Sequence, residues 1–594
     1  MDLFKEELIR MLKSIEETNE PFDELVVSRQ VRSVGEKLEL NENPIEFIAE
    51  IFAFDLHEAG ENSKWDLYYG PQLEGTNQDG SAFEYPSISM ITSDIIQYWM
   101  NRAKTSKHPV LTARYADLVW EFTKVVTGTQ PDIEFAQLTI DKVIFLANNG
   151  SYSRDISVIK KLERALSIAL QTNDSNRVEQ LKLTIMSFED RVAEDNKPGL
   201  WGFSFDLLID KKKISLTEAE QLKIISDLEM RLSNVTRDSE SDSFNPWAAE
   251  AAVERLAAYY RKHNKSEEMK KALLAFGEAF ITISNKSSPI QASSWLQRVH
   301  SVYSDYLLRD EANTIVKKIR ELGPRMNSDM KQTSHSFEIP AEKMNEYVTR
   351  MIDGTLEEVL ERILIQYIPQ QKQVREQLYE LSKGAPVSFL FSTQIHDHQG
   401  RHVATIGSLE IDENGHIIAQ MSQNMQITAV FLREVMTKLI NKFKLTEDEL
   451  VNYLYKSPAF DTLKTGIIQL GLKSYLKNDH LVAIHLLIPQ IEDILRRILE
   501  AIGGTVLKKS RGGSGFHFKT LDELLRDEQL VAVFGEDVML YFRVVLTDQR
   551  GWNLRNDVCH GITPQSAFGS AMADRIVHIL LCLAPVRYIE DEKQ

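Results

Sequence analysis

The sequence predicts a mainly α-helical protein with several domains. Its 594 residues are too many for one hydrophobic core, since a domain typically takes roughly 100–200 residues. Over most of this length, apolar residues recur at three- and four-residue spacing, which is the period of an amphipathic helix. Short segments with β-branched alternation interrupt this pattern only once, so we expect a helical protein with one small β insertion.

Residues 1–88 are expected to form an N-terminal helical segment followed by a loop. Residues 1–58 carry two or three amphipathic helical patterns. Residues 59–88 are rich in Gly, Asn and Tyr, a composition typical of loops.

Residues 89–322 are expected to form a helical array. Helix-length segments such as 112–126, 156–171 and 248–262 follow one another, separated by polar breaks such as 234–246. Successive helices of this length favour a solenoid-like arrangement, in which each helix pair packs on the next. No strict sequence repeat accompanies the pattern.

A linker at 323–340 leads to a third part, residues 341–445, which begins with helices. Within it, residues 386–420 alternate and are β-branched. Turn sequences at His398-Gln-Gly400 and Glu413-Asn-Gly415 lie between the extended runs. This pattern predicts a small three-stranded β-meander.

Residues 446–594 are expected to form a C-terminal helical bundle. The predicted helices lie at about 458–477, 481–502, 521–533, 537–559 and 564–583. Their ends carry capping signals: Gly503-Gly504 after the second, a Thr520–Glu523 capping box before the third, Gly561 after the fourth, and Thr563-Pro564 before the fifth.

Charge is distributed unevenly along the chain. The net charge is -18, yet from Val451 to Gln594 there are 17 Lys and Arg against 17 Asp and Glu. The negative excess therefore lies in the first 450 residues. A general nucleic-acid coat protein would instead carry clustered cations, so any contact with nucleic acid is expected in the neutral C-terminal part.

The remaining composition predicts a cytoplasmic protein without a membrane segment. The two cysteines, Cys559 and Cys582, form no CxxC pair, which is typical of a reducing compartment. The acidic, amphipathic N-terminus does not resemble a signal peptide. The apolar run from Ile579 to Pro585 is far shorter than the ~20 residues of a membrane helix.

The candidate for chemistry is Arg555-Asn-Asp-Val-Cys-His560-Gly561. In a helix, Asn556 and His560 share a face, and Asp557 is placed to bond the ring of His560. Histidine exchanges protons near neutral pH, and arginine holds phosphate oxygens. The segment therefore suits cleavage of a phosphodiester, and this chemistry requires no metal or cofactor. Arg, Asn and His are also common at helix C-termini, where cations are favoured, so the spacing alone leaves a capping role open.

The segment resembles the Arg-x(4–6)-His signature of the HEPN superfamily, and more closely an uncharacterised HEPN-like family with the signature Arg-Asn-x-x-x-His-Gly. The helix from His485 to Arg496 is also similar to that family, and the resemblance covers residues 446–590. It implies a helical, usually dimeric domain. Many members are metal-independent endoribonucleases of toxin–antitoxin, abortive-infection and antiviral systems. By this resemblance, Arg555 and His560 would be catalytic and Asn556 supporting.

Further candidates lie near the motif. Glu492 either supports it as a carboxylate or forms an i,i+4 ion pair with Arg496 on a solvated face. A basic, Gly-rich segment with two Phe residues is either an RNA-contacting loop or a plain connection. Its candidate RNA-binding residues are Lys508, Lys509, Arg511 and Lys519. His396, His398 and His402 surround a predicted turn that directs them to different faces, so no metal site is expected.

Two functions from different classes remain open. The first is a defence-type or abortive-infection endoribonuclease that acts on RNA. It would dimerise through exposed apolar faces of helices 481–502 and 564–583, and a protein trigger or partner would bind its acidic N-terminal body. The second is a non-catalytic helical scaffold or a nucleotide-binding dimerisation module. Exposed Arg555 and His560 side chains that converge in a cleft would favour the enzyme, and burial in ion pairs would favour the scaffold.

Overall fold

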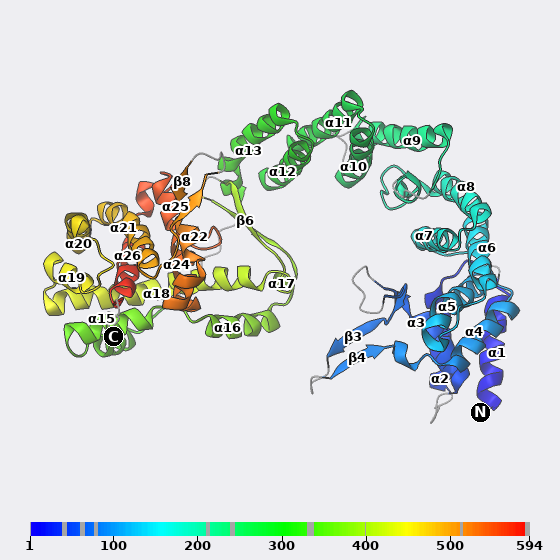
Figure 1. The fold of residues 1–594 in the computed structure, drawn as a ribbon, viewed down its shortest axis with the longest axis horizontal. Helices are drawn as coiled ribbons and strands as arrows, with labels where there is room; N and C mark the ends of the chain where they lie inside the picture. Colours follow the sequence, from blue (N-terminus) through cyan, green and yellow to red (C-terminus); the bar gives the residue numbers. More distant parts are fainter. Residues whose placement is uncertain are drawn as a thin grey trace. The chain divides into compact units, whose positions relative to one another are not determined.

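The computed structural model describes residues 2–18, 20–37, 44–59, 66–76, 81–209, 214–237, 244–329, 338–397, 400–510 and 515–587. Within these ranges the protein is mainly α-helical, and its strands pair only in two-stranded sheets (Figure 1). The chain divides into two compact units, Met1–Ile319 and Arg320–Gln594. The predicted fold class is thus confirmed, whereas the division into four smaller parts stays a prediction.

Three helices open the first unit: α1 (Asp2–Glu16), α2 (Glu24–Lys37) and α3 (Ile45–Asp55). The long loop predicted at 59–88 is wrong where the structure describes it. Strands β1 (His57–Glu58) and β2 (Tyr69–Gly70) pair antiparallel, as do β3 (Leu73–Thr76) and β4 (Ala82–Tyr85), and the 3₁₀ turn η1 (Ile88–Met90) follows. The tyrosines that suggested a loop instead anchor the first hairpin, since Tyr69 donates a hydrogen bond to buried Asp117.

The rest of the first unit is a succession of helices, each of which contacts the next over most of the series. They are α4 (Ser93–Thr105), α5 (Pro109–Thr127), α6 (Ile133–Asn149), α7 (Asp155–Gln171), α8 (Ser175–Val192), the π-helical turn η2 (Phe205–Ile209), α9 (Glu218–Arg237), α10 (Pro246–Lys262), α11 (Ser266–Ser284), α12 (Pro289–Asp305) and α13 (Arg309–Asp329). The solenoid-like arrangement itself stays a prediction. The linker expected from residue 323 begins later, because α13 continues through Pro324 to Asp329.

The second unit begins within α13, at Arg320, and continues with α14 (Ala341–Met351), α15 (Leu356–Gln366), α16 (Gln371–Gly384) and the short α17 (Val387–Leu390). Strands β5 (Thr393–His396) and β6 (His402–Ile406) then form one hairpin. The third strand of the predicted meander is wrong, because α18 (Glu413–Phe443) begins where its turn was expected. Asp412 caps α18 by accepting from the backbone N–H of Gly415, and the buried residues Ile417, Ile418, Met421 and Met425 follow helical spacing.

The remaining elements lie between residues 447 and 583. They are α19 (Glu447–Leu454), η3 (Thr462–Lys464), α20 (Thr465–Leu476), α21 (His480–Ala501), β7 (Leu507–Lys509), β8 (Phe516–Phe518), α22 (Leu521–Leu525), α23 (Glu528–Phe534), α24 (Glu536–Leu546), α25 (Leu554–Cys559), η4 (Gln565–Ala567) and α26 (Ser570–Leu583). The Thr520–Glu523 capping box is confirmed.

Four predicted helices of this region differ from the structure. The helix expected at 458–477 begins only at Thr465, after a 3₁₀ turn at 462–464, and the helix expected at 521–533 is divided into α22 and α23. The helix expected at 537–559 is divided by a turn at 547–553. The helix expected from Pro564 begins only at Ser570, because a 3₁₀ turn takes up residues 565–567.

Helix α26 lies at the centre of the second unit, and its residues from Ala573 to Leu583 are all buried. Its polar side chains bond to several other helices. Asp574 accepts from Tyr475 of α20, Arg575 donates to the carbonyl of Tyr367 after α15, and His578 contacts the hydroxyl of Tyr541 on α24. Helices from 341–445 and from 446–584 thus share one core. The expectation that 564–583 offers an exposed apolar face for a dimer is wrong, because that face is already covered.

Candidate functional site

The short helix α25 carries the Arg555–Gly561 motif. It begins after Asn553, whose φ of 50° lies in the left-handed region, and it ends at Cys559. His560 is the C-cap residue, and Gly561 follows with a φ of 65°. This is a glycine-terminated helix end of the kind the sequence predicts, but the helix is only six residues long.

Arg555 is held by a carboxylate from a different helix. Its Nη2 and Nε lie 3.0 and 3.2 Å from Oε2 of Glu492 on α21, and its Nη1 donates to Oδ1 of Asn556 at 3.3 Å. Glu492 also accepts from Arg496 at 2.8 Å. One carboxylate oxygen of Glu492 thus contacts the motif arginine and the other forms the i,i+4 pair, but that pair is only 17% exposed and does not lie on a solvated face. The supporting role of Glu492 stays a prediction.

Asn556 and Asp557 are bound within the turn that precedes the motif. The amide of Asn556 donates to the side chain of Asn553 at 2.8 Å and to the carbonyl of Thr547 at 3.3 Å. Asp557 accepts from the amide of Asn553 at 2.8 Å. The contact predicted between Asp557 and the imidazole of His560 stays a prediction. The bonds of Asn556 and Asp557 to the side chain of Asn553 fix the start of α25.

His560 is exposed, and its ring has no hydrogen-bond partner among the described residues. At about 100° per residue, five positions turn a helix by roughly 140°, so Arg555 and His560 leave α25 on different sides. The ion pair of Arg555 favours the scaffold, whereas the exposure of His560 favours the enzyme. The arginine is three-quarters covered, with 25% of its side chain exposed, and lies in an ion pair, while the histidine is accessible to a ligand.

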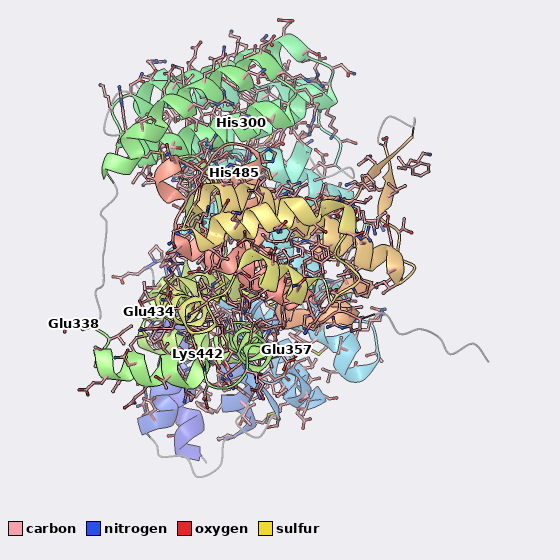
Figure 2. The ribbon with its side chains drawn as sticks, turned by 90° about the vertical axis from the view of Figure 1, so that its left-hand side faces the viewer. His300, Glu338, Glu357, Glu434, Lys442 and His485 are labelled. Atoms are coloured by element: carbon pink, nitrogen blue, oxygen red, sulfur yellow. The ribbon has the colours of Figure 1, made fainter. Side chains whose placement is uncertain are left out.

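Two polar residues of α21, His485 and Glu492, contact the chain at and after the motif. Glu492 contacts Arg555, and about two turns earlier on the helix the exposed ring of His485 stacks on Phe568, with ring centroids 5.0 Å apart. Figure 2 labels His485 on the surface of its helix. The imidazole of His485, the ring of Phe568 and the ion-paired Arg555 therefore lie beside α21.

The predicted RNA-contacting segment forms the β7–β8 hairpin. Lys508 contacts Glu523, and Lys519 pairs with Asp527 at 3.0 Å. Lys509 is exposed and has no ion-pair partner in the described residues, and Arg511 lies outside them. The guanidinium of Arg496 lies 4.7 Å from the centre of the Phe518 ring. The hairpin therefore contacts the motif through Arg496 and Glu492, but two of its lysines already have carboxylate partners.

Two residues near the motif were not predicted. Asn553 occupies the N-cap position of α25 without a side-chain bond to a backbone N–H, and its side chain bonds to the side chains of Asn556 and Asp557. The turn residues Gly551 and Asn553 inside the expected helix were the signal for it. Arg543 on α24 has a buried Nε with no hydrogen-bond partner among the described residues. Burial, and then the nearby Arg526, lower its pKa. The only feature of the sequence that pointed to Arg543 was its place within the apolar run from Leu540 to Val545.

Other candidate chemistry finds little support in the described residues. His396 and His402 lie on neighbouring strands, with ring centroids 5.7 Å apart, and His398 lies outside those residues. No group of three or more metal-ligating side chains occurs in the part of the chain that the structure covers. Cys559 is exposed, whereas burial raises the pKa of the Cys582 thiol.

Comparisons with protein families, with characterised proteins and with solved structures found no match to this chain. Among the described helices, none has the length and apolarity to span a membrane. A functional proposal therefore rests on the residues of the motif and their contacts.

Proposed function

We propose that the protein is a metal-independent endoribonuclease of a bacterial defence or abortive-infection type, with Arg555 and His560 as its catalytic residues. The observation that supports this most is the exposed side chain of His560 at the C-terminal end of α25, the helix that also carries Arg555. The proposal also draws on the resemblance of the segment to the HEPN signature.

In this proposal, His560 takes the proton of a ribose 2′-hydroxyl while the 2′-oxygen attacks the neighbouring phosphorus. The bond from phosphorus to the 5′-oxygen breaks, and a protonated imidazole supplies the proton to that leaving oxygen. Arg555 holds the phosphate oxygens and stabilises the charge that develops on them. The products are a 2′,3′-cyclic phosphate and a 5′-hydroxyl.

The imidazole that takes the proton of the 2′-hydroxyl must start unprotonated. The imidazole that gives a proton to the leaving 5′-oxygen must start protonated. A homodimer through the C-terminal domain would supply two imidazoles, one in each state. Glu492 holds Arg555 in place until a phosphate competes for the guanidinium, and Asn556 keeps the arginine oriented. Lys509 and Arg511 are proposed to contact the RNA backbone. Lys508 and Lys519 would join them only by exchanging their carboxylate partners for phosphate.

The ion pair between Arg555 and Glu492 also favours the alternative, a helical scaffold or nucleotide-binding dimerisation module without catalysis. A guanidinium that is three-quarters covered and paired with a carboxylate is a common structural arrangement. Activity of the purified chain separates the two proposals.

The test is incubation of the purified full-length chain with total RNA, beside His560→Ala. The matched control is His263→Ala, because His263 is likewise an exposed histidine at the C-cap of a helix, α10. We expect His560→Ala to lose roughly 10²–10⁴-fold in rate and His263→Ala to cleave like the wild type. Cleavage by all three proteins at equal rates, or by none, would favour the scaffold.

A further inference from the structure

A cavity of about 420 Å³ lies within the first unit, walled by α2, α5, α6, α7 and the β1–β2 hairpin. Its size falls in the range of roughly 300–1,000 Å³ that is typical of small-molecule sites. The rings of Tyr68, Tyr69 and Tyr152 line it together with charged side chains. The cavity therefore combines room for an organic group with polar groups that would orient one.

One cation on the cavity wall has no carboxylate partner in direct contact. Five cationic side chains and three carboxylates line the cavity, and two carboxylates outside the lining, Asp23 and Glu121, also pair with lining cations. Four of the cations have a carboxylate partner in direct contact: Arg154 with Asp23, Lys160 with Glu58, Lys161 with Glu24, and Arg164 with Asp117. The fifth cation, Arg114, has none.

Arg114 is 6% exposed, and its bonded partners in the described residues are backbone carbonyls. Its Nε donates to Ala53 and its Nη2 to Leu56, and its guanidinium lies 4.3 Å from the centre of the Tyr69 ring. The other guanidinium N–H groups have no described hydrogen-bond acceptor. No guanidinium nitrogen of Arg114 is among the buried atoms that lack a partner in the described residues, so these groups are accessible from the cavity, and arginine keeps its charge there.

The neighbouring carboxylates stabilise this charge without bonding to it. Burial acts to raise the pKa of Glu24, but Lys161 and Arg114 lower it to about 2. Glu24 is therefore ionised, yet its contacts are with Lys161 and Tyr152. The N–H groups of Arg114 that face the cavity remain available to an anion.

We propose that this cavity binds a small organic anion whose phosphate or carboxylate group docks on Arg114. Arginine presents paired N–H donors that match either group. The organic part would pack against Tyr68 and Tyr69, and the wall carboxylate Glu58 would accept from its hydroxyl or amino groups. This site lies wholly in the first unit and does not depend on the ribonuclease proposal.

The test is isothermal titration of the full-length chain with matched pairs of charged and neutral probes. The pairs are adenosine 5′-monophosphate with adenosine, glucose 6-phosphate with glucose, and citrate with glycerol. Inorganic phosphate measures the anion alone. We expect saturable binding of at least one organic anion, weaker binding of inorganic phosphate, and no binding of the neutral counterpart. The phosphate and carboxylate probes show which anionic group the site prefers.

Two variants connect the binding to this cavity. Arg114→Gln removes a charged hydrogen-bond donor and should weaken binding by roughly tenfold to a hundredfold. Because Arg114 is buried and its loss could unfold the unit, Lys160→Gln serves as a second variant at the mouth, where 61% of the side chain is exposed. Lys160→Gln removes a cation and leaves Glu58 without its ion-pair partner, so the affinity for an anion should fall.

Lys104→Gln is the matched control, because Lys104 is also an exposed lysine paired with a glutamate, Glu134, outside the cavity. It should bind like the wild type. The proposal is overturned if no probe anion binds at millimolar concentration, if a neutral counterpart binds as tightly as its anion, or if Lys160→Gln and Lys104→Gln have the same affinity.

Discussion

At the scale of single residues, Glu492 connects two guanidinium groups from different helices. It contacts Arg555 of α25 and Arg496 of α21, and only 17% of its side chain is exposed. The sequence suggested two separate interpretations of this residue. The structure shows a contact to both arginines, because a carboxylate has two oxygens and each one takes a different arginine.

Glu492→Gln should therefore destabilise the second unit and reduce any RNA cleavage. The amide carries no charge to compensate two partly buried arginines, and the expected loss is about 1–3 kcal/mol of unfolding free energy. Urea denaturation measures the loss. Glu500→Gln, an exposed position on the same helix, is the control and should stay within about 0.5 kcal/mol of the wild type. Equal stability of both variants would mean that the ion pair contributes nothing.

The buried histidine of α26 makes stability depend on pH. Burial, and then the charge of Arg575, lower the pKa of His578 to about 3. An unfolded histidine has a pKa of about 6.5, so the unfolded chain binds an additional proton between these values. Unfolding free energy must fall as the pH drops below about 6.5, by up to ~1.4 kcal/mol per pH unit, until the pH reaches the folded pKa.

His578→Gln should remove this one-proton contribution, even though it lowers stability overall through lost contacts with Tyr541 and the carbonyls of α15. The measurement is urea denaturation at several pH values between 4 and 7 for both proteins. The wild type should show the steeper dependence by about one proton. Parallel curves would mean that His578 is protonated in the folded chain or exposed to solvent.

At the scale of elements, the end signals at Thr520–Glu523 and Gly561 were predicted correctly, whereas the helix start at Thr563-Pro564 and the interruptions of helices were not. The Thr520–Glu523 capping box depends on neighbouring residues only, so the sequence is sufficient to predict it. The turn between α24 and α25 depends on a long-range fit. The backbone N–H of Trp552 bonds to the carbonyl of Val544 at 2.7 Å, and its indole lies against Ser422 of α18. Because the apolar helical pattern continues on both sides of this turn, the sequence alone does not reveal the break between α24 and α25.

Long-range packing also decides the structure of the segment after β6, which forms helix α18 in place of the expected third strand. The alternating residues near 416–420 also fit a helix, because Ile417, Ile418 and Met421 form one buried face of α18. The core of the whole unit, rather than the local pattern, decides between the two structures. For the motif, residue types and spacing were sufficient to select Arg555, His560 and Glu492 as candidates, but the role of Asn553 required the turn to be known.

Gly551→Ala should destabilise the turn that positions α25. A Cβ at this position would lie 2.3 Å from the carbonyl oxygen of Val544 and 3.0 Å from its carbonyl carbon, and the backbone of α24 has no room to yield. We expect a loss of about 1–3 kcal/mol and reduced cleavage, measured by urea denaturation and by the RNA assay.

Gly466→Ala is the control for this substitution. A Cβ there meets no atom within 4 Å, and the residue lies in helix α20. Alanine is the better helix former, so stability should be unchanged or higher by up to about 1 kcal/mol. If Gly551→Ala behaves like Gly466→Ala, the close approach of the turn to α24 does not constrain α25.

At the scale of the whole molecule, the predicted homodimer needs a surface other than α26. That helix is buried in the second unit, whereas Leu463, Ile467 and Leu470 along η3 and α20 are exposed. We still expect a dimer, because a single Arg555–His560 set provides one imidazole for two proton transfers. Light scattering at micromolar concentration should give twice the chain mass. A strict monomer that still cleaves RNA would show that one motif is sufficient.

Arg555 and His560 are proposed to cleave RNA without a metal ion. The most direct measurement of this proposal is the amount of 2′,3′-cyclic phosphate ends formed from a defined RNA in the presence of EDTA. We predict that the full-length wild-type chain forms these ends in chelator at the same rate as without it. Arg555→Ala and His560→Ala should form few, since loss of the proton-transfer group costs roughly 10²–10⁴-fold. Cleavage that stops in EDTA and returns with Mg²⁺, or cyclic phosphate formed equally by wild type and both variants, would contradict the account.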